Sequence, residues 1–184
     1  MSENTIKTGV EANKMVSLNN TPTDREETLR RTAIHEIGHV LSLFVTGGFV
    51  DMIQYIEINE DGEGFTSVSR ETAKSNLPFP DQVNYNPTRL FQEVCFAVGG
   101  GVFKSLYYPD SDVCDDEDIT IITQYLQWGY DYTDNEVHTI LQTCRLMLIQ
   151  ALKKYTTHSN TQALIKRLIR QRKLTIQEIT NYIG

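Results

Sequence analysis

Two histidines and a glutamate in the segment RRTAIHEIGHVLSLF, residues 30–44, have the types and spacing of a metal site. His35 and His39 are four positions apart, so on a helix they share one face, about one turn from each other. Both imidazoles can then bind a single ion, with Zn–N distances of ~2.0–2.1 Å. Glu36 lies beside this face, where a carboxylate can accept a proton from a zinc-activated water. HEIGH therefore predicts a zinc site with Glu36 as catalytic base.

The alternative for HEIGH is a pair of ordinary polar histidines on a partly exposed helix. Two observations favour the metal site. The chain has only 4 histidines, and two of them fall within this one motif. Gly38 also lies inside the predicted helix, where a glycine costs ~1 kcal/mol relative to alanine. We therefore expect another part of the chain to approach the backbone closely at Gly38.

A third ligand must come from elsewhere in the chain. The extended motif HExxHxxGxxH is excluded, because Ser42 and Val45 occupy its glycine and its final histidine positions. His138 and His158 lie far along the chain, and we expect His138 on the surface. The strongest acidic cluster, SDVCDDEDITIITQYL, contains Asp112, Asp115, Asp116, Glu117 and Asp118. Acidic residues also favour the first turn of a helix without any metal, so spacing alone does not choose among these carboxylates.

The helix that must position HEIGH is predicted to start at TPTDREE, with Thr23 as N-cap, and to end at the glycines of TGGF. We expect residues 1–22 before it to form a flexible tail. Apolar residues recur along this helix at helical spacing, and at 3.6 residues per turn they occupy a different face from the histidines. The members of this predicted buried stripe are Leu29, Ala33, Ile37, Leu41 and Phe44.

The remaining elements are predicted to be one β-hairpin and further helices. VDMIQYIEI, residues 50–58, and FTSVS are rich in β-branched and aromatic residues, and they flank a turn at Asp61–Gly62. Three prolines predict a loop between Ser75 and Pro87. Helices are predicted at about 87–106, 116–127, 134–156 and 160–171, with a short one after Thr175. The fold class is therefore mainly α with a small β-hairpin or sheet, in one domain of residues 23–184.

Composition and charge exclude several other classes of protein. The 184 residues are 40% hydrophobic and 22% charged, as in one soluble globular domain, and the net charge of -7 argues against nucleic-acid binding. No segment approaches the ~20 apolar residues of a membrane helix, and the N-terminus lacks the features of a secretory signal. Three cysteines without a CxxC motif indicate reduced thiols. We therefore expect a soluble, cytoplasmic protein.

The order of the motifs resembles the peptidase domain of the FtsH-type ATP-dependent zinc proteases, over roughly residues 26–181. TAIHEIGHVL resembles the family's HEAGHA helix, GEGFTS its glycine-x-threonine strand, and LPFPD a following Leu-Pro acidic loop. FAVGGGVFKSL stands where the family has a Gly-Gly-Arg-x-x-Glu helix, and CDDEDITIITQYL where it has a Ser-Asn-Asp-Leu helix. LIKRLIRQRKLTIQEI resembles the closing helices. The resemblance implies that Asp118 is the third zinc ligand, and that an extended substrate pairs with the edge of the 50–68 hairpin.

The chain also departs from this family. Gly101 and Lys104, or their neighbours, replace the arginine and glutamate of the Gly-Gly helix. We expect no ATPase module, because 184 residues leave no room for one, and no membrane anchor. GGGVFKS is not a phosphate-binding loop, since Val98 and Phe103 stand where GxxxxGK[ST] has glycine. We expect this segment to be a tightly packed helix instead.

The sequence thus predicts a zinc-dependent endopeptidase that cuts peptides or unfolded segments of protein. A His/His/Asp site with an open position suits Zn²⁺ best, with iron, cobalt and nickel as alternatives. The implied partners are further copies of the chain or a separate ATPase. The competing interpretation is a catalytically silent metal-binding module with an interaction or regulatory role. A helical domain without a metal is the third interpretation.

Overall fold

The computed structural model describes residues 22–48, 53–68, 86–110 and 116–183, and the predicted tail and most of the predicted 75–87 loop lie outside them. The fold is mainly helical with one small antiparallel sheet, as expected from the sequence. Two long helices, α1 (Pro22–Val45) and α3 (Pro87–Tyr107), pack against each other along their length at the centre. Among the described helices, none combines the length and the apolar character needed to cross a bilayer.

The centre of α1 is buried on most of its sides, because α3, the sheet and α6 all pack against it. Four of the five residues of the predicted stripe are at most 4% exposed, but Phe44 is 39% exposed, so that part of the prediction is wrong. Leu43 is buried in the last turn instead, because the chain turns back across it and the Gly48 amide donates to the Leu43 carbonyl. At the other end, α1 already includes Pro22, so Thr23 lies within the helix and is not its N-cap.

Glycines allow α1 and α3 to approach each other closely. A Cβ on Gly38 would lie 2.7 Å from the Gly99 carbonyl oxygen and 2.7 Å from Cβ of Phe103. This confirms that another part of the chain approaches the backbone at Gly38. It also confirms that the GGG segment is a tightly packed helix, since Gly99 and Gly100 are buried within α3.

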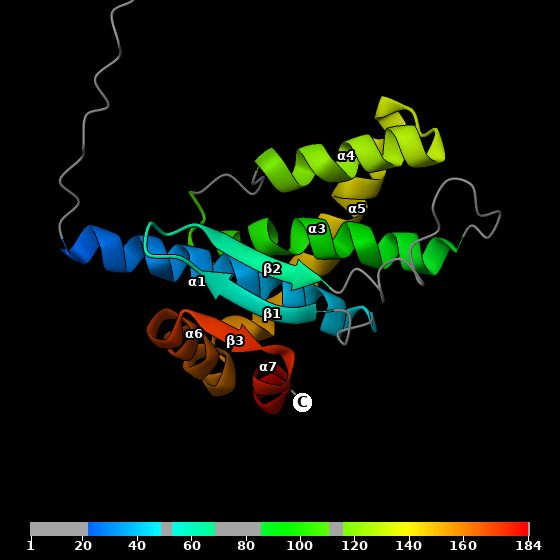
Figure 1. The fold of residues 1–184 in the computed structure, drawn as a ribbon. Coiled ribbons are helices and arrows are strands. Elements are labelled where there is room, and N and C mark those ends of the chain that lie inside the picture. The colour runs from blue at the N-terminus through cyan, green and yellow to red at the C-terminus, as the bar shows by residue number, and fades with distance from the viewer. Residues whose placement is uncertain (1–21, 49–52, 69–85, 111–115, 184) are drawn as a thin grey trace, which may run out of the picture.

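The sheet has three strands in the order β2-β1-β3. The strands β1 (Ile53–Ile58) and β2 (Gly64–Val68) form the predicted hairpin, and Gly62 in its turn has a φ of 89°. Three residues near the C-terminus, Lys173–Thr175, form β3 and pair antiparallel with β1. The sequence did not predict this strand. β2 is therefore at the outer edge of the sheet, on the side of the molecule where α4 lies (Figure 1).

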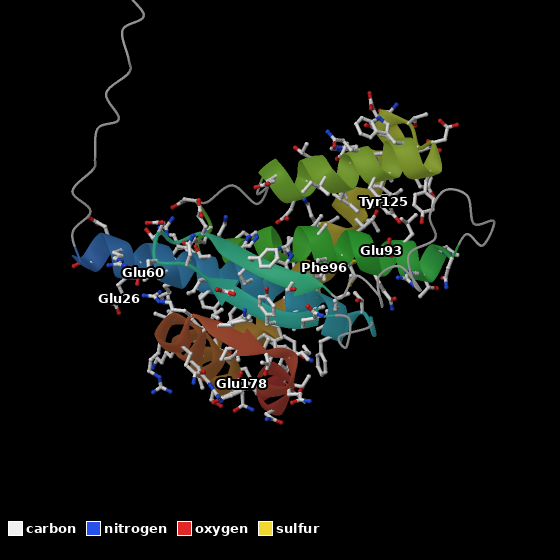
Figure 2. All side chains as sticks on the ribbon, viewed as in Figure 1. Glu26, Glu60, Glu93, Phe96, Tyr125 and Glu178 are labelled. Atoms are coloured by element: carbon white, nitrogen blue, oxygen red, sulfur yellow. The ribbon has the colours of Figure 1, made fainter. Side chains whose placement is uncertain are left out.

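The other helices surround this centre. Their bounds are α4 Asp116–Tyr130, α5 Asp134–Leu152, α6 Ser159–Gln171 and α7 Ile176–Ile183. In Figure 1, α4 lies over α3, whereas α6 and α7 lie beside β3. The helix predicted for 134–156 ends at Leu152 and continues as a short 3-10 helix, Lys153–Thr156. Figure 2 shows Tyr125 of α4 and Glu93 of α3 on the facing sides of these two helices.

Candidate metal centre

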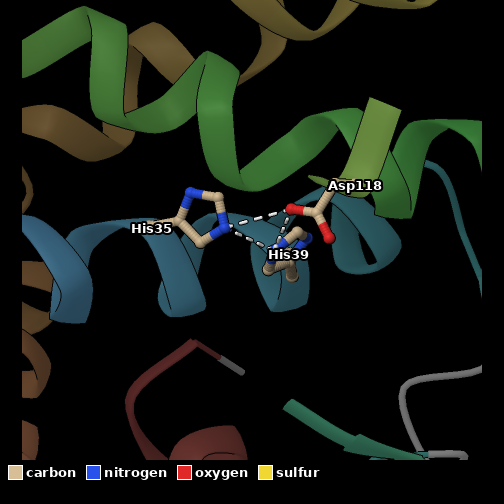
Figure 3. A group of neighbouring side chains, drawn as sticks. All are labelled: His35, His39 and Asp118. Atoms are coloured by element: carbon tan, nitrogen blue, oxygen red, sulfur yellow. Dashed lines mark hydrogen bonds and ion pairs between the residues drawn. The ribbon is translucent and has the colours of Figure 1, made fainter. Parts of the chain in front are cut away.

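The structure brings together three side chains that offer electron pairs to a cation. His35 and His39 lie on successive turns of α1, and Asp118 reaches them from the first turn of α4 (Figure 3). Nε2 of His35 and Nε2 of His39 are 2.9 Å apart, and Oδ2 of Asp118 lies 3.2 Å from the first and 3.4 Å from the second. Among the described residues, this is the group whose donor atoms converge closely enough to hold a metal ion.

These distances fit a tetrahedral zinc ion. Bonds of ~2.0–2.1 Å at tetrahedral angles place ligand atoms about 3.4 Å apart. The two distances to Asp118 are close to this value, and the two imidazole nitrogens, 2.9 Å apart, lie somewhat nearer to each other. Two neutral imidazoles and a carboxylate would repel one another at this distance unless a proton or a metal cation lay between them. The donor set of two nitrogens and one oxygen is one that zinc commonly uses, with a fourth position left for water or substrate.

A hydrogen bond on the far side of His39 sets its tautomer. Nδ1 of His39 lies 2.7 Å from the carbonyl oxygen of Phe96 on α3. A carbonyl can only accept, so Nδ1 carries the hydrogen, and in the neutral ring Nε2 then offers its lone pair towards Asp118 and His35. The ring of Phe96 also lies against His39, with 5.1 Å between the ring centroids. A hydrogen bond from the second ring nitrogen to a backbone carbonyl, as at Phe96, orients a metal-binding histidine and raises the basicity of the nitrogen that binds the metal.

The charges within the group shift its pKa values in opposite directions. Burial alone would raise the pKa of the Asp118 carboxyl, but the hydrogen bonds and charges of His35 and His39 hold it well below its usual value. Burial alone would lower the pKa of His39, but the hydrogen bond to Asp118 and the negative charges of Glu36 and Asp118 raise it above its usual value. The surroundings thus favour an anionic Asp118 opposite a positive centre.

Gly100 of α3 provides the space beside the ligand nitrogens. A Cβ at this position would lie 2.6 Å from Nε2 of His39 and 2.7 Å from Nε2 of His35. Real Cβ atoms do not come this close, so any side chain larger than hydrogen would displace the histidines. The close packing of α3 on α1 therefore brings its backbone directly against the candidate metal centre.

Glu36 is buried next to the two histidines and is held by the edge strand. Glu36 is only 5% exposed, and its Oε2 accepts a hydrogen bond of 2.6 Å from the Thr66 hydroxyl on β2. The neighbouring Gly64 leaves room for the carboxylate, because a Cβ there would collide with Oε1 of Glu36. The structure therefore places the predicted base between α1 and β2, beside the candidate ligands.

These residues line a cleft of about 740 Å³ between α1, α3, α4 and the edge strand. Phe96 and Ile121 contribute apolar surface, and Arg31, Lys104 and Glu117 contribute charges. Figure 2 places Phe96 on α3, beside β2. His35, His39 and Glu36 are mostly buried, and the cleft is their opening to solvent. An extended molecule can therefore reach the candidate metal centre from outside.

None of the other candidate ligands that the structure describes joins this group. His138 is exposed on α5, as expected, and His158 is exposed before α6. Asp112, Asp115 and the side chain of Asp116 lie outside the described residues. Sequence reasoning missed Phe96, Gly100 and Thr66 as residues of the site. All three lie in segments that carry the family resemblance, Thr66 in GEGFTS and the other two in FAVGGGVFKSL.

Comparisons with known proteins do not add a family to this geometry. No protein-family model matches the chain, and no curated protein matches it. The function therefore has to be argued from the site.

Proposed function

We propose that this protein is a zinc-dependent peptidase, related to the peptidase domain of the FtsH-type proteases. One observation carries the proposal: three convergent ligand atoms and a held carboxylate lie together at the base of an open cleft. His35, His39 and Asp118 would hold Zn²⁺. When bound, the zinc would lower the pKa of a water and polarise the carbonyl of the scissile peptide bond.

In this proposal Glu36 is the general base and the general acid. Its carboxylate takes a proton from the attacking water as the new C–O bond forms at the scissile carbonyl carbon. The same group then gives a proton to the nitrogen of the leaving amine as the C–N bond breaks. Thr66 holds one carboxylate oxygen, which restricts Glu36 to one orientation during both transfers. General acid–base catalysis of this kind contributes about 10²- to 10⁴-fold in rate.

The substrate we propose is an extended polypeptide segment. β2 pairs with β1 on one side only, and within the described residues no strand pairs with its other side. That outer edge offers backbone groups to an incoming strand, and three residues of β2, Gly64, Phe65 and Thr66, line the cleft. A peptide that adds to β2 would therefore lie across the candidate metal centre, which agrees with cleavage of peptides or unfolded segments.

A second candidate, a catalytically silent metal-binding module, is favoured by one residue. Lys104 lines the cleft, whereas the resembling family has a glutamate in the corresponding helix. A cation at this position changes the charge of the cleft wall and the way in which a substrate is received. The intact Glu36, which a purely structural site would not need, supports the peptidase.

The test is Glu36→Gln compared with the wild type, with zinc content and peptide cleavage measured on the same samples. The amide oxygen of glutamine still accepts the Thr66 hydrogen bond, so the change removes the proton acceptor and keeps the hydrogen bond. We expect about one zinc per chain in both proteins, and cleavage of an unfolded, fluorescently labelled protein only by the wild type. Glu26→Gln, an exposed change on the same helix, is the matched control and should cleave normally. Full activity of Glu36→Gln would contradict the role of this residue. If the wild type binds zinc but does not cleave the protein, the result favours the catalytically silent metal-binding module over the peptidase.

A further inference from the structure

One helix of the cleft, α4, carries exposed apolar side chains that do not take part in its packing. Ile122 and Leu126, on its inner face, are 5% and 0% exposed and belong to the hydrophobic core. Ile121 and Trp128 are 59% and 78% exposed, and neither belongs to that core. Tyr125 turns towards α3 and shares a hydrogen bond with Tyr130. Two large apolar side chains are thus exposed on the outer face of α4, although the helix is already anchored on its inner side.

Ile121 and Trp128 lie on the same face of α4. They are seven positions apart, which is close to two full helical turns, so their side chains follow one line along the helix. The exposed Gln124 lies between them on this face. Exposed tryptophans are uncommon on surfaces that contact only water, and tryptophan is enriched among residues that dominate binding energy.

This surface is continuous with the candidate metal centre. Ile121 lines the cleft, and Asp118, one of the three convergent ligands, lies one turn before it on the same helix. Trp128 lies ~10.5 Å further along the axis, since each helical residue rises 1.5 Å. An extended chain rises ~3.3 Å per residue, so about three residues would cover this distance. A polypeptide that leaves the cleft past Ile121 would therefore reach Trp128.

We propose that the outer face of α4, formed by Ile121 and Trp128, is a second binding surface for the polypeptide substrate outside the metal cleft. It selects unfolded segments that carry apolar side chains about three residues apart beyond the cleaved bond. This inference rests on the proposed peptidase function and specifies its substrate class. It makes the affinity depend on the length of the substrate, because a short peptide fills the cleft alone.

Trp128 itself reports on the occupancy of this surface, because the chain contains a single tryptophan. The experiment uses zinc-loaded Glu36→Gln protein and two tryptophan-free synthetic peptides, one long and one short. The long peptide carries two leucines about three residues apart beyond the segment that fills the cleft. We expect the long peptide to shift Trp128 emission to shorter wavelength, and the short peptide to leave it unchanged. A long peptide with both leucines replaced by serine should also leave it unchanged.

Two variants test how much Trp128 contributes to the affinity for the long peptide. Trp128→Ala should weaken binding of the fluorescently labelled long peptide by at least about tenfold and leave the short peptide unaffected. In an otherwise wild-type enzyme the same change should raise KM for the long peptide and leave kcat unchanged. The matched control is Leu146→Ser on α5, which removes an apolar side chain that is 65% exposed but does not line the cleft. This control should bind both peptides normally.

The outcomes separate this inference from the function on which it rests. If the wild type cleaves the long peptide but Trp128→Ala binds it normally, the second surface is wrong and the peptidase stands. If no peptide is cleaved but Trp128 emission shifts as expected, the peptidase is wrong and the surface stands as a binding site. If sedimentation shows that Trp128→Ala turns a dimer into a monomer, a second copy of the chain covers this face, which overturns the proposal.

Discussion

Thr66 donates a hydrogen bond of 2.6 Å to the carboxylate of Glu36 and so ties the edge strand of the sheet to the central helix. The two residues are 30 positions apart in the chain, yet both line the same cleft. Gly64, two residues before Thr66, has no side chain to block this contact. The strand that we propose to receive the substrate therefore also orients the proposed base.

Thr66→Val should lower kcat by roughly 10- to 100-fold, because Glu36 loses the contact that fixes its orientation. The metal content should stay unchanged, since Thr66 is not one of the convergent ligands. Thr66→Ser keeps the hydroxyl and should restore most of the activity, which a loss of packing alone would not allow. The measurement is the pair kcat and KM for one peptide, together with zinc content. Equal activity of the valine and serine variants would contradict the positioning role.

Gly100→Ala should greatly reduce metal affinity, because the added methyl group would displace the ring nitrogens of His35 and His39. Gly129→Ala is the matched control, since it is also a helical glycine but its Cβ would meet only Tyr125 at an ordinary 3.8 Å. Alanine raises helix stability by up to ~1 kcal/mol, so this control should be neutral or slightly stabilising. Zinc titration and circular dichroism measure both properties. Normal zinc binding by Gly100→Ala would show that the ion does not use these nitrogens.

Asp118→Ala should remove the third ligand and weaken zinc binding by at least about 100-fold, with the helical content preserved. The physical reason is the loss of the anionic oxygen, which lies 3.2 and 3.4 Å from the two imidazole nitrogens. His138→Ala removes an exposed histidine of α5 and serves as the control. Elemental analysis after dialysis gives the result. If Asp118→Ala keeps a full complement of zinc, the third ligand must be another residue.

Zinc binding should release protons, because histidine binds a metal as the neutral ring. The pKa of His39 is raised above its usual value in the metal-free protein, mainly by the hydrogen bond to Asp118 and by nearby negative charge, which favours the protonated ring, whereas zinc needs the neutral ring. The pKa of Asp118 is lowered, so its carboxyl is already ionised and releases none. Zinc affinity should therefore rise with pH until the pH exceeds the raised pKa of His39, and then level off. Calorimetry in two buffers of different ionisation enthalpy counts the protons, and identical enthalpies in both buffers would contradict this prediction.

The parts of the fold that sequence could predict are those with strong local patterns. The HEIGH helix, the hairpin and the helices from Pro87 onwards follow from apolar periodicity and from turn residues. β3 escaped prediction because a strand of three residues, two of them exposed, has too little alternation to recognise. It forms only because β1 offers its free edge. Phe44 had the right spacing for the core, but the course of the chain after α1 decided that Leu43 is covered instead.

The candidate site divides in the same way. The pair His35 and His39 follows from the geometry of one helix, but Asp118 depended on the resemblance, because five carboxylates in its cluster had equal standing. The backbone contact of His39 with Phe96 and the space above Gly100 arise from the packing of α3 on α1. Such tertiary contacts have no local pattern, so only the structure could reveal them.

The separation of 83 residues between His35 and Asp118 also has a consequence for the order of events during synthesis. The HEIGH helix leaves the ribosome early, but it offers only two ligands, and Glu36 lacks its strand partner until the hairpin forms. Asp118, the third candidate ligand, follows with α4, after the whole of α3 has been translated. A growing chain would thus carry no complete hydrolytic centre, and the proposed activity would begin only when these distant segments have docked. The proposed peptidase activity would therefore be absent while the chain is still being synthesised.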